Sequence, residues 1–215
     1  MGKDELRADG VTVTRGHRVL LPATSLAVKA GELVVVAGDP GPGHALLALA
    51  LAGRLDHFGG AVSYDGSPDR AIRQKAVALV DVPMVSEPDD AIPLRTIVGE
   101  ELAMGRHPAG RGHVEHWLTE SGFSRYADAR IEDLPAAIRT TVLARLAEQR
   151  PGVRFLVITL PERNGGLPAD WWELGRHATE RGYGVIVTVS LGTAERLDHE
   201  PVLLGNARTK KESAR

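Results

Sequence analysis

A short apolar run, a glycine- and proline-rich segment and a second apolar run follow one another without interruption over residues 31–55. The first run, GELVVVA, is short and rich in valine, which favours a buried strand. The second, HALLALALAGRL, repeats its apolar residues at helical spacing. Between them stands GDPGPG, residues 38–43, whose glycines and prolines are typical of a tight turn. The sequence therefore predicts a buried strand that turns directly into a helix through this glycine loop.

Two more apolar runs, VRFLVITL and YGVIVTVS, lie in the last third of the chain. Both are rich in β-branched residues and too short for free-standing helices, and a helix-like stretch around DWWELGRHATE separates them. Because a strand, a helix and a second strand in this order form parallel neighbours, we expect strands buried on both faces of an α/β sheet.

Short strand-like and helix-like segments fill the rest of the chain. VTVT, SLAVKAG, GELVVVAG and GAVSYDG carry glycine-bearing turns, which predicts a small β lobe of short strands around the glycine loop. Helical spacing recurs in LRTIVGEELAM, HVEHWLTESGF and AIRTTVLARLAEQR. This pattern favours one α/β domain rather than two.

Composition limits the functions open to this chain of 215 residues. Its 43% hydrophobic content supports one substantial core, and its net charge of -2 gives no electrostatic basis for a nucleic-acid partner. The absence of cysteine excludes disulfides, zinc–cysteine sites and thiol catalysis. The charged start, MGKDELRADG, lacks the apolar region of a signal peptide, and no apolar run is long enough to span a bilayer. We expect a cytoplasmic protein without direct membrane insertion, with a flexible tail at 205–215.

The glycine loop has the spacing of a phosphate-binding loop. Gly38 and Gly43 are separated by four residues, as in G-x-x-x-x-G-K-[ST], where backbone N–H groups hold phosphates, a lysine reaches them and a hydroxyl binds Mg²⁺. The next two residues here are His44 and Ala45. Because the glycine spacing alone fits a plain tight turn equally well, the loop by itself leaves two interpretations.

The order of these landmarks along residues 5–204 resembles the nucleotide-binding domain of ATP-binding-cassette (ABC) transporters. The matching pieces are GELVVVAG before the glycine loop, then AGRL, GAVSYDG, AVALVDVP, a helical insert, DLPAAIRTTVLARLAEQRPG, FLVITLPE and VIVTVS. The resemblance implies a P-loop NTPase-like ABC ATPase fold: a mostly parallel core sheet with helices on both faces, a small antiparallel β lobe and a helical insert. It places the core and β lobe at 5–90 and 130–204 and the helical insert at 91–129 of a single domain.

The resemblance implies a nucleotide-binding loop that departs from the family pattern. This loop would comprise Gly38, Asp39, Gly41, Gly43, His44, Ala45 and Leu46. In it the lysine is replaced by the shorter, mostly neutral imidazole of His44, and Ala45 lacks the hydroxyl that binds Mg²⁺. Pro42 removes one backbone N–H from the loop as well.

The family's metal-binding and catalytic positions also carry other residues here. The glutamine falls at Val82, the metal-associated aspartate at Thr159, the catalytic glutamate at Leu160 and the last-strand histidine at Ser190 or its neighbour. The family's Mg²⁺ positions would thus be occupied by Ala45, Val82 and Thr159. We therefore predict neither a metal site nor a catalytic residue.

Two further contacts of the family with nucleotide change in the same way. The signature LSGGQ is replaced by Leu134, Pro135, Ala136, Ala137 and Ile138, although Pro135 is well placed to start the following helix. The aromatic residue that stacks on adenine is replaced by Thr14 and Arg15. Arg15 is the candidate for base stacking, because a guanidinium can lie flat against a base.

Phosphoryl transfer requires mainly positioning and electrostatic stabilisation, so these replacements remove most of what the protein supplies. We expect a pseudo-ATPase subunit that docks on a membrane permease, on a second ABC ATPase subunit, or on both. It would lie on the inner face of the cell membrane and keep at most weak binding of ATP or another nucleotide, without well-held Mg²⁺. The docking face would comprise Val82, Pro83 and the insert from Pro93 to Phe123.

Two alternative functions stay open. In one, the chain is an ATP-hydrolysing subunit with unusual motifs, completed by a dimer partner. In the other, it is a free-standing cytosolic regulator that senses a nucleotide. Outside these motifs, His113 and His116 share a helix face as metal ligands would, but without a third ligand a solvated surface is the expected role.

Overall fold

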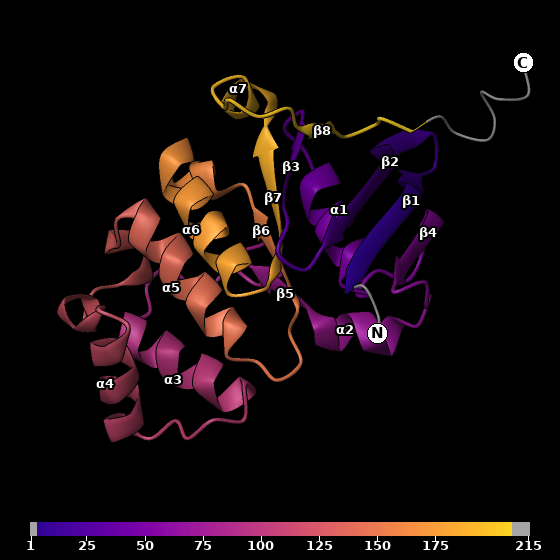
Figure 1. Ribbon diagram of the computed structural model, residues 1–215. Helices are drawn as coiled ribbons and strands as arrows, with labels where there is room; N and C mark the ends of the chain where they lie inside the picture. Colours follow the sequence, from indigo (N-terminus) through magenta and orange to yellow (C-terminus); the bar gives the residue numbers. More distant parts are fainter. Residues whose placement is uncertain (1–3, 208–215) are drawn as a thin grey trace, which may run out of the picture.

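The computed structural model describes residues 4–207, which form two sheets and the helices around them (Figure 1). The larger sheet has the strand order β5-β6-β7-β3-β8, and its strand pairs are parallel. Its strands are β3 (Leu33–Gly38), β5 (Val77–Val80), β6 (Phe155–Thr159), β7 (Gly184–Ser190) and β8 (Val202–Leu203). Every residue of β5 and β6 is buried, as expected for parallel strands covered on both faces. The predicted parallel α/β sheet is confirmed.

The smaller sheet is antiparallel and has the order β2-β1-β4. Its strands are β1 (Glu5–Arg15), β2 (Arg18–Lys29) and β4 (Gly59–Tyr64). The expectation of short strands is wrong for β1 and β2, which have 11 and 12 residues. The expectation that the GELVVVAG strand, β3, belongs to the β lobe is also wrong, because β3 lies in the parallel sheet. The reason is burial: the last four residues of β3 are all buried, which suits a central parallel strand better than an antiparallel one.

The helices cover both faces of the parallel sheet. They are α1 (Gly43–Leu51), α2 (Arg70–Ala76), α3 (Leu94–Met104), α4 (Arg111–Glu120), α5 (Ala136–Glu148), α6 (Pro168–Glu180) and α7 (Leu191–Ala194), with short 3₁₀ turns η1 (Ser124–Tyr126), η2 (Ile131–Asp133) and η3 (Pro161–Asn164). The predicted helices α1, α3, α4, α5 and α6 are confirmed. None of the helices within residues 4–207 is both long and apolar enough to cross a membrane.

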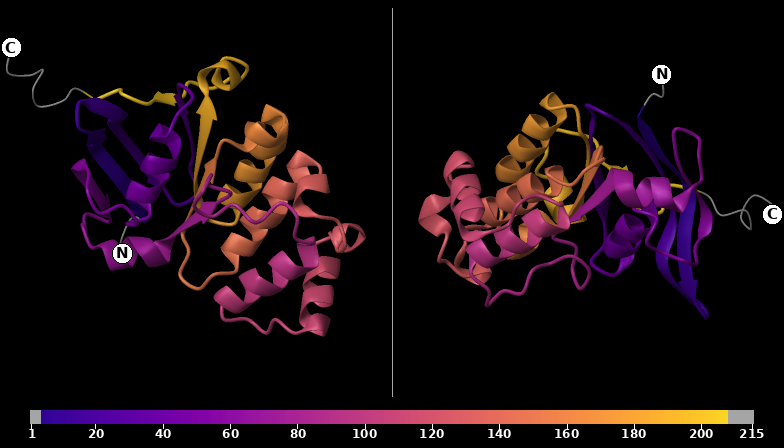
Figure 2. Two further views of the ribbon diagram at one scale, coloured as in Figure 1. Left: turned by 180° about the vertical axis from the view of Figure 1, so that it is seen from behind. Right: turned by 90° about the horizontal axis from the view of Figure 1, so that it is seen from below.

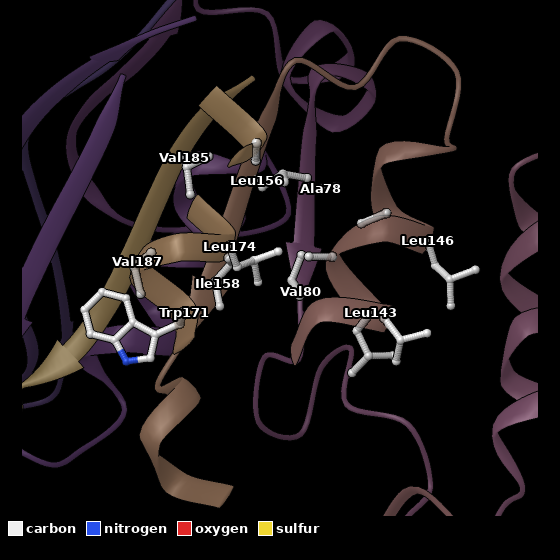
Figure 3. Close-up of a cluster of buried hydrophobic side chains, with 14 of the residues drawn as sticks. Ala78, Val80, Leu143, Leu146, Leu156, Ile158, Trp171, Leu174, Val185 and Val187 are labelled. Atoms are coloured by element: carbon white, nitrogen blue, oxygen red, sulfur yellow. The ribbon is translucent and has the colours of Figure 1, made fainter. Parts of the chain in front are cut away.

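Each face of the parallel sheet has its own apolar core. On one face, Trp171 and Leu174 of α6 lie over β6 and β7, while Leu143 and Leu146 of α5 lie beside β5 (Figure 3). On the other face, α1 and the antiparallel sheet enclose the alternate strand residues, among them Val157. The alternation of side chains along each strand therefore divides the apolar residues between two layers.

The helical insert lies beyond α5, at the end of the molecule opposite the antiparallel sheet (Figure 2). Backbone hydrogen bonds join the two ends of the insert, from the N–H of Leu94 to the carbonyl of Ala129 and from the N–H of Ile131 to the carbonyl of Ile92. These bonds close the insert at its base, so α3 and α4 project from the core as one unit.

Candidate functional site

The carboxyl ends of neighbouring strands bring the predicted site residues to one edge of the parallel sheet. Gly38 at the end of β3 pairs with Ser190 at the end of β7, and Thr159 at the end of β6 pairs with Thr188 of β7. Val82 follows β5, the neighbour of β6. Ligands of open α/β sheets bind outside this edge, so the glycine loop and the other predicted positions lie where a ligand is expected.

The glycine loop carries the chain from β3 directly into α1. The N-cap of α1 is Pro42, which makes no side-chain capping hydrogen bond. The first N–H groups of a helix have no partner inside the helix and can hold an anion, although Pro42 contributes none. Beside the loop lies a cavity of about 210 Å³, lined by residues 39–43, by Arg18 and neighbouring residues of β2, and by Leu204. Ligand pockets commonly span roughly 300–1,000 Å³, so this cavity is small for a whole nucleotide.

His44 is buried within the first turn of α1 and its side chain is already engaged by the loop. Its exposed fraction is 0%, and its Nε2 lies 3.2 Å from the backbone carbonyl oxygen of Asp39. Burial lowers the pKa of the imidazole, while the Asp39 carbonyl and the charge of Glu162 act in the opposite direction. The ring is therefore neutral at pH 7. The neighbouring residue, Ala45, offers no hydroxyl.

Glu162 is a carboxylate at this edge to which the motif comparison gave no role. Its Oε1 accepts a hydrogen bond of 2.7 Å from the backbone N–H of Ser190. Its Oε2 is buried and has no hydrogen-bond partner among residues 4–207, and the same holds for Nδ1 of His44 and the hydroxyls of Thr159 and Thr188. Buried polar atoms without partners are rare in folded proteins, and a catalytic role or a bound water or ion accounts for many of them. The available signal was an acid directly after Pro161 in FLVITLPE.

A second group of charged residues that sequence reasoning missed lies next to Val82. Asp81 is buried and contacts Arg139 of α5 and Arg163 of η3, while Asn164 donates to its Oδ2 at 3.2 Å. Burial acts to lower the pKa of Arg139, but the carboxylates of Asp81 and Asp90 outweigh it and raise that pKa. This network ties the segment after β5 to α5 and to η3.

The segment in the place of the signature motif starts α5. Pro135 is the N-cap of this helix, as the sequence predicts for a residue at the helix start, and Leu134 is buried before it. Ala136 lies near η3, since a Cβ on Gly166 would approach its side chain to 3.6 Å. Residues Ala136, Ala137 and Ile138 therefore form the first turn of α5 close to the segment that follows β6.

Two other predicted positions are Val82, which is buried, and Leu160, which has an unusual backbone conformation. Val82 has an exposed fraction of 0%, so the expectation that it contributes surface to a docking face is wrong; Met84, 92% exposed, provides apolar surface in that segment instead. Val82 is buried because it belongs to the core shared with α1. Leu160 has a left-handed conformation with a φ of 49°, which is unusual for a residue with a side chain.

The candidate base-stacking residue lies at the end of the β1–β2 hairpin. Arg15 pairs with Arg18 at the last position of that ladder and is exposed. The arginine that lines the cavity beside the glycine loop is Arg18. Stacking by Arg15 stays a prediction, and Arg18 is the guanidinium nearer to the loop cavity.

Metal ligands do not gather at this edge. Within the part of the chain that the structure describes, no group of three or more histidine, cysteine, aspartate or glutamate side chains could hold a metal ion, and His113 and His116 belong to none. The residues present at the predicted Mg²⁺ positions, Ala45, Val82 and Thr159, offer a single hydroxyl between them, which does not fit a Mg²⁺ site.

The fold is the one that ATP-binding cassettes of ABC transporters have. An ATP-binding subunit of an ABC transporter has a TM-score of 0.65 at 18% identity, over 95% of this chain and 88% of that one. A nucleotide-free ATP-binding cassette from an ABC transporter also has a TM-score of 0.65, at 16% identity, over 97% of this chain and 93% of that one.

Relatives at the sequence level carry the same family name. The chain is 31% identical to the cytochrome c biogenesis ATP-binding export protein CcmA of Novosphingobium aromaticivorans, over 95% of this chain and 93% of that protein. It is 30% identical to the hemin import ATP-binding protein HmuV of Pseudomonas aeruginosa, over 94% of this chain and 84% of that protein. No family model matches the sequence. The chain belongs to the family of ABC transporter ATP-binding proteins.

Proposed function

We propose that this chain is a non-hydrolysing ABC subunit that docks on a membrane permease, on an active ATPase subunit, or on both. The observation that carries the proposal is the state of His44. Its ring is fully buried and neutral, and its Nε2 contacts the loop's own Asp39 carbonyl. A side chain in that state supplies no mobile positive charge to a transferring phosphoryl group, whereas catalysis of this transfer depends on such charge.

The residues around His44 support the same conclusion. Ala45 and Thr159 leave no carboxylate and no second hydroxyl for Mg²⁺, and Leu160 brings neither a proton acceptor nor a group that orients water. One preorganised donor is worth roughly 10²–10³ in rate, so the combined loss leaves no useful turnover. The N–H groups of the first turn of α1 remain, and they support weak, metal-independent binding of phosphate groups.

The surface of the helical insert supports a docking role. A groove of about 580 Å³ lies between α3 and α4, with Gly99, Ala103, Val114 and Leu118 among its lining residues. Small and apolar residues in a groove favour the side chains of a partner helix. Met84, on the segment after β5, adds exposed apolar surface. We propose that the partner subunit contacts this groove and Met84.

Hydrolysis and binding are tested on the purified chain. We expect no ATP hydrolysis above that of a protein-free blank, and calorimetry with ATP should give weak heat that is equal with Mg²⁺ and with a chelator. Hydrolysis well above that of the blank, or tight Mg²⁺-dependent binding, would refute the non-hydrolysing role.

Docking is tested by co-purification from native membranes. A polytopic membrane protein should copurify with the tagged chain, and Gly99→Trp, which fills the groove, should reduce its recovery. Gly112→Ala on α4 is the control, because a Cβ there meets nothing within 4 Å. Recovery of no complex would favour the free-standing nucleotide-sensing regulator.

Glu162 supports one second candidate, an ATP-hydrolysing subunit completed by a dimer partner. Its Oε2, which is buried and has no hydrogen-bond partner among residues 4–207, stands at the edge where a ligand is expected, and a carboxylate there could accept a proton from water. If this candidate is correct, the isolated chain or its complex hydrolyses ATP, and Glu162→Gln abolishes this activity while the Thr159→Ala, Leu160→Ala variant retains it.

A further inference from the structure

A second cavity lies at the opposite edge of the parallel sheet, where β5 begins. It has a volume of about 560 Å³, and its lining includes residues of α2, of the end of α3, and of the segments that follow α1, α3 and α5. In Figure 1, α2, the end of α3 and the segment after α5 come together near the bottom of the view. We call this second cavity the basic cavity. The glycine loop follows the carboxyl end of β3, at the other edge of the sheet, so the basic cavity is a separate site.

Cationic side chains dominate the lining of the basic cavity. Arg54, Lys75, Arg106 and Arg150 all line it. Arg150 is held from one side, since its Nη2 donates to Oε2 of Glu101 at 2.6 Å. The Nε of Arg150 is buried and has no hydrogen-bond partner within residues 4–207. Positive charge therefore exceeds negative charge around the cavity.

Two of these guanidinium groups repel each other. The pKa of Arg54 is lowered by burial and by the positive charge of Arg150. Several helices end near the cavity, and the carboxyl end of a helix attracts cations, but this attraction acts only within the last turn of the helix. It does not explain why two arginines that repel each other lie together here. An anion bound between them removes the repulsion and gives the buried Nε of Arg150 a partner.

The backbone around the basic cavity makes room for these side chains. Gly152 has a φ of 86°, and a Cβ at that residue would lie 2.5 Å from Cε of Lys75. The missing side chain lets Lys75 cross this position. Arg106 has a φ of 61° because it caps the end of α3, where its N–H bonds the carbonyl of Ala103 and the N–H of His107 bonds the carbonyl of Leu102.

We propose that the basic cavity binds a small phosphorylated molecule through a diphosphate group. Guanidinium groups match phosphate oxygens with paired hydrogen bonds, and Arg54 and Arg150 present two such groups, with Lys75 as a third cation. Val77 and Val153 give the cavity an apolar part beyond the cations, which suits the organic portion of the ligand. The volume lies within the range of about 300–1,000 Å³ that small-molecule sites occupy.

The position of the basic cavity gives this ligand a structural consequence. The cavity is lined on one side by α2 and Arg54, which belong to the core, and on the other by Met104 and Arg106, which belong to the helical insert. A bound diphosphate bridges these parts and holds α3 against the core. Because the site lies at the sheet edge opposite the glycine loop, it acts independently of nucleotide binding there and goes beyond the proposed subunit role.

The test uses inorganic pyrophosphate as the probe, titrated into the purified chain in a calorimeter without Mg²⁺. We expect saturable binding that weakens by about tenfold or more in the double variant Arg54→Gln, Lys75→Gln, because hydrogen bonds to charged groups are lost. Arg145→Gln, which removes an exposed arginine of α5, is the matched control and should bind within about twofold of the unmodified chain, since it changes net charge alone.

Two measurements keep the proposal falsifiable. The thermal midpoint of Arg54→Gln without ligand should equal or exceed that of the unmodified chain, because the repulsion with Arg150 is relieved. Pyrophosphate should raise the midpoint of the unmodified chain more than that of the double variant, which keeps only the weak phosphate binding proposed at the glycine loop. The proposal is overturned if pyrophosphate does not bind at millimolar concentration, or if the double variant binds as tightly as the unmodified chain, which places the anion elsewhere. Neither result depends on ATP hydrolysis or on docking.

Discussion

Arg139 and Asp81 form a buried, two-pronged ion pair across the edge of the parallel sheet. The Nε and Nη2 of Arg139 donate to Oδ2 and Oδ1 of Asp81, both at 3.1 Å, and the two side chains are 6% and 4% exposed. Arg163 adds a further bond of 2.8 Å to the same carboxylate. One aspartate thereby joins the segment after β5 to α5 and to the segment after β6.

Removal of Asp81 should destabilise the fold strongly. Asp81→Ala leaves two arginines without their buried counter-charge, and such a loss typically costs about 3–5 kcal/mol. Asp90→Ala is the control, since Asp90 bonds the same Arg139 but is 62% exposed, and loss of an exposed pair costs about 0–1 kcal/mol. Urea unfolding of both variants measures the difference. Equal free energies of unfolding would show that the buried network does not hold the three segments together.

The partners in this network explain why sequence reasoning missed it. Asp81 and Arg139 are separated by 58 residues, and nothing in either local pattern marks them as a pair. By contrast, β3 and α1 were predictable, because their apolar residues are adjacent in sequence and have strand-like and helix-like spacing. The short helix α2, with 7 residues, escaped because it has too few turns for a clear apolar period.

The candidate site was also predictable only in part. The glycine loop was predictable from spacing, but burial of His44 and Val82 was not, because both depend on packing that only the folded chain creates. The strand lengths of the β lobe were also missed. In β1, the stretch RADG precedes VTVT and hides the start of the strand, since the exposed Arg7 and Asp9 alternate with the buried Leu6 and Ala8.

Burial of His44 predicts a pH dependence of stability. The pKa of His44 is lowered in the folded protein, so the unfolded chain binds a proton first as the pH falls below about 6.5. The contribution of the neutral, buried His44 to the free energy of unfolding is complete above about pH 6.5. It is lost progressively as the pH falls from that value to the pKa of His44 in the folded protein. Free energies of unfolding of the unmodified chain and of His44→Gln, measured from pH 5 to 8 in one buffer series, should converge or cross as the pH falls. Parallel curves would contradict the lowered pKa.

Close packing of Leu204 on the glycine loop predicts that a side chain at Gly38 destabilises the fold. A Cβ at Gly38 would lie 2.4 Å from Cδ1 and 2.7 Å from Cγ of Leu204. Gly38→Ala should therefore cost about 1–3 kcal/mol, as overpacking does. The double variant with Leu204→Ala should recover part of this loss relative to the sum of the single effects, as expected for residues in contact.

Gly112→Ala is the matched control for this glycine. A Cβ at Gly112 meets nothing within 4 Å, and the residue lies within α4. Alanine is a better helix former than glycine by about 1 kcal/mol, so this variant should gain stability. If Gly38→Ala were as stable as Gly112→Ala, the contact between Leu204 and the glycine loop would contribute nothing to the free energy of unfolding.

Introducing the three groups that the family resemblance implies at these positions should make nucleotide binding depend on metal. The triple variant His44→Lys, Ala45→Ser, Thr159→Asp supplies a positive charge, a hydroxyl and a carboxylate at the edge where Gly38, Thr159 and Ser190 meet. Hard oxygen ligands and phosphate oxygens are the partners that Mg²⁺ prefers. We expect ATP to bind this variant about tenfold or more tightly with Mg²⁺ than with a chelator, since hydrogen bonds and ion contacts to charged groups are worth roughly 1.5–3 kcal/mol.

The same triple variant separates binding from hydrolysis. Leu160 is retained in it, so the variant gains metal-dependent affinity without a proton acceptor at that position, and its hydrolysis should stay at the level of the unmodified chain. Circular dichroism establishes that it folds, which matters because Thr159 is only 1% exposed and an aspartate there is costly without a cation. For the same reason Mg²⁺ alone should raise its thermal midpoint and leave that of the unmodified chain unchanged. A folded triple variant whose ATP affinity ignores Mg²⁺ would mean that these three groups do not create a metal site at this edge.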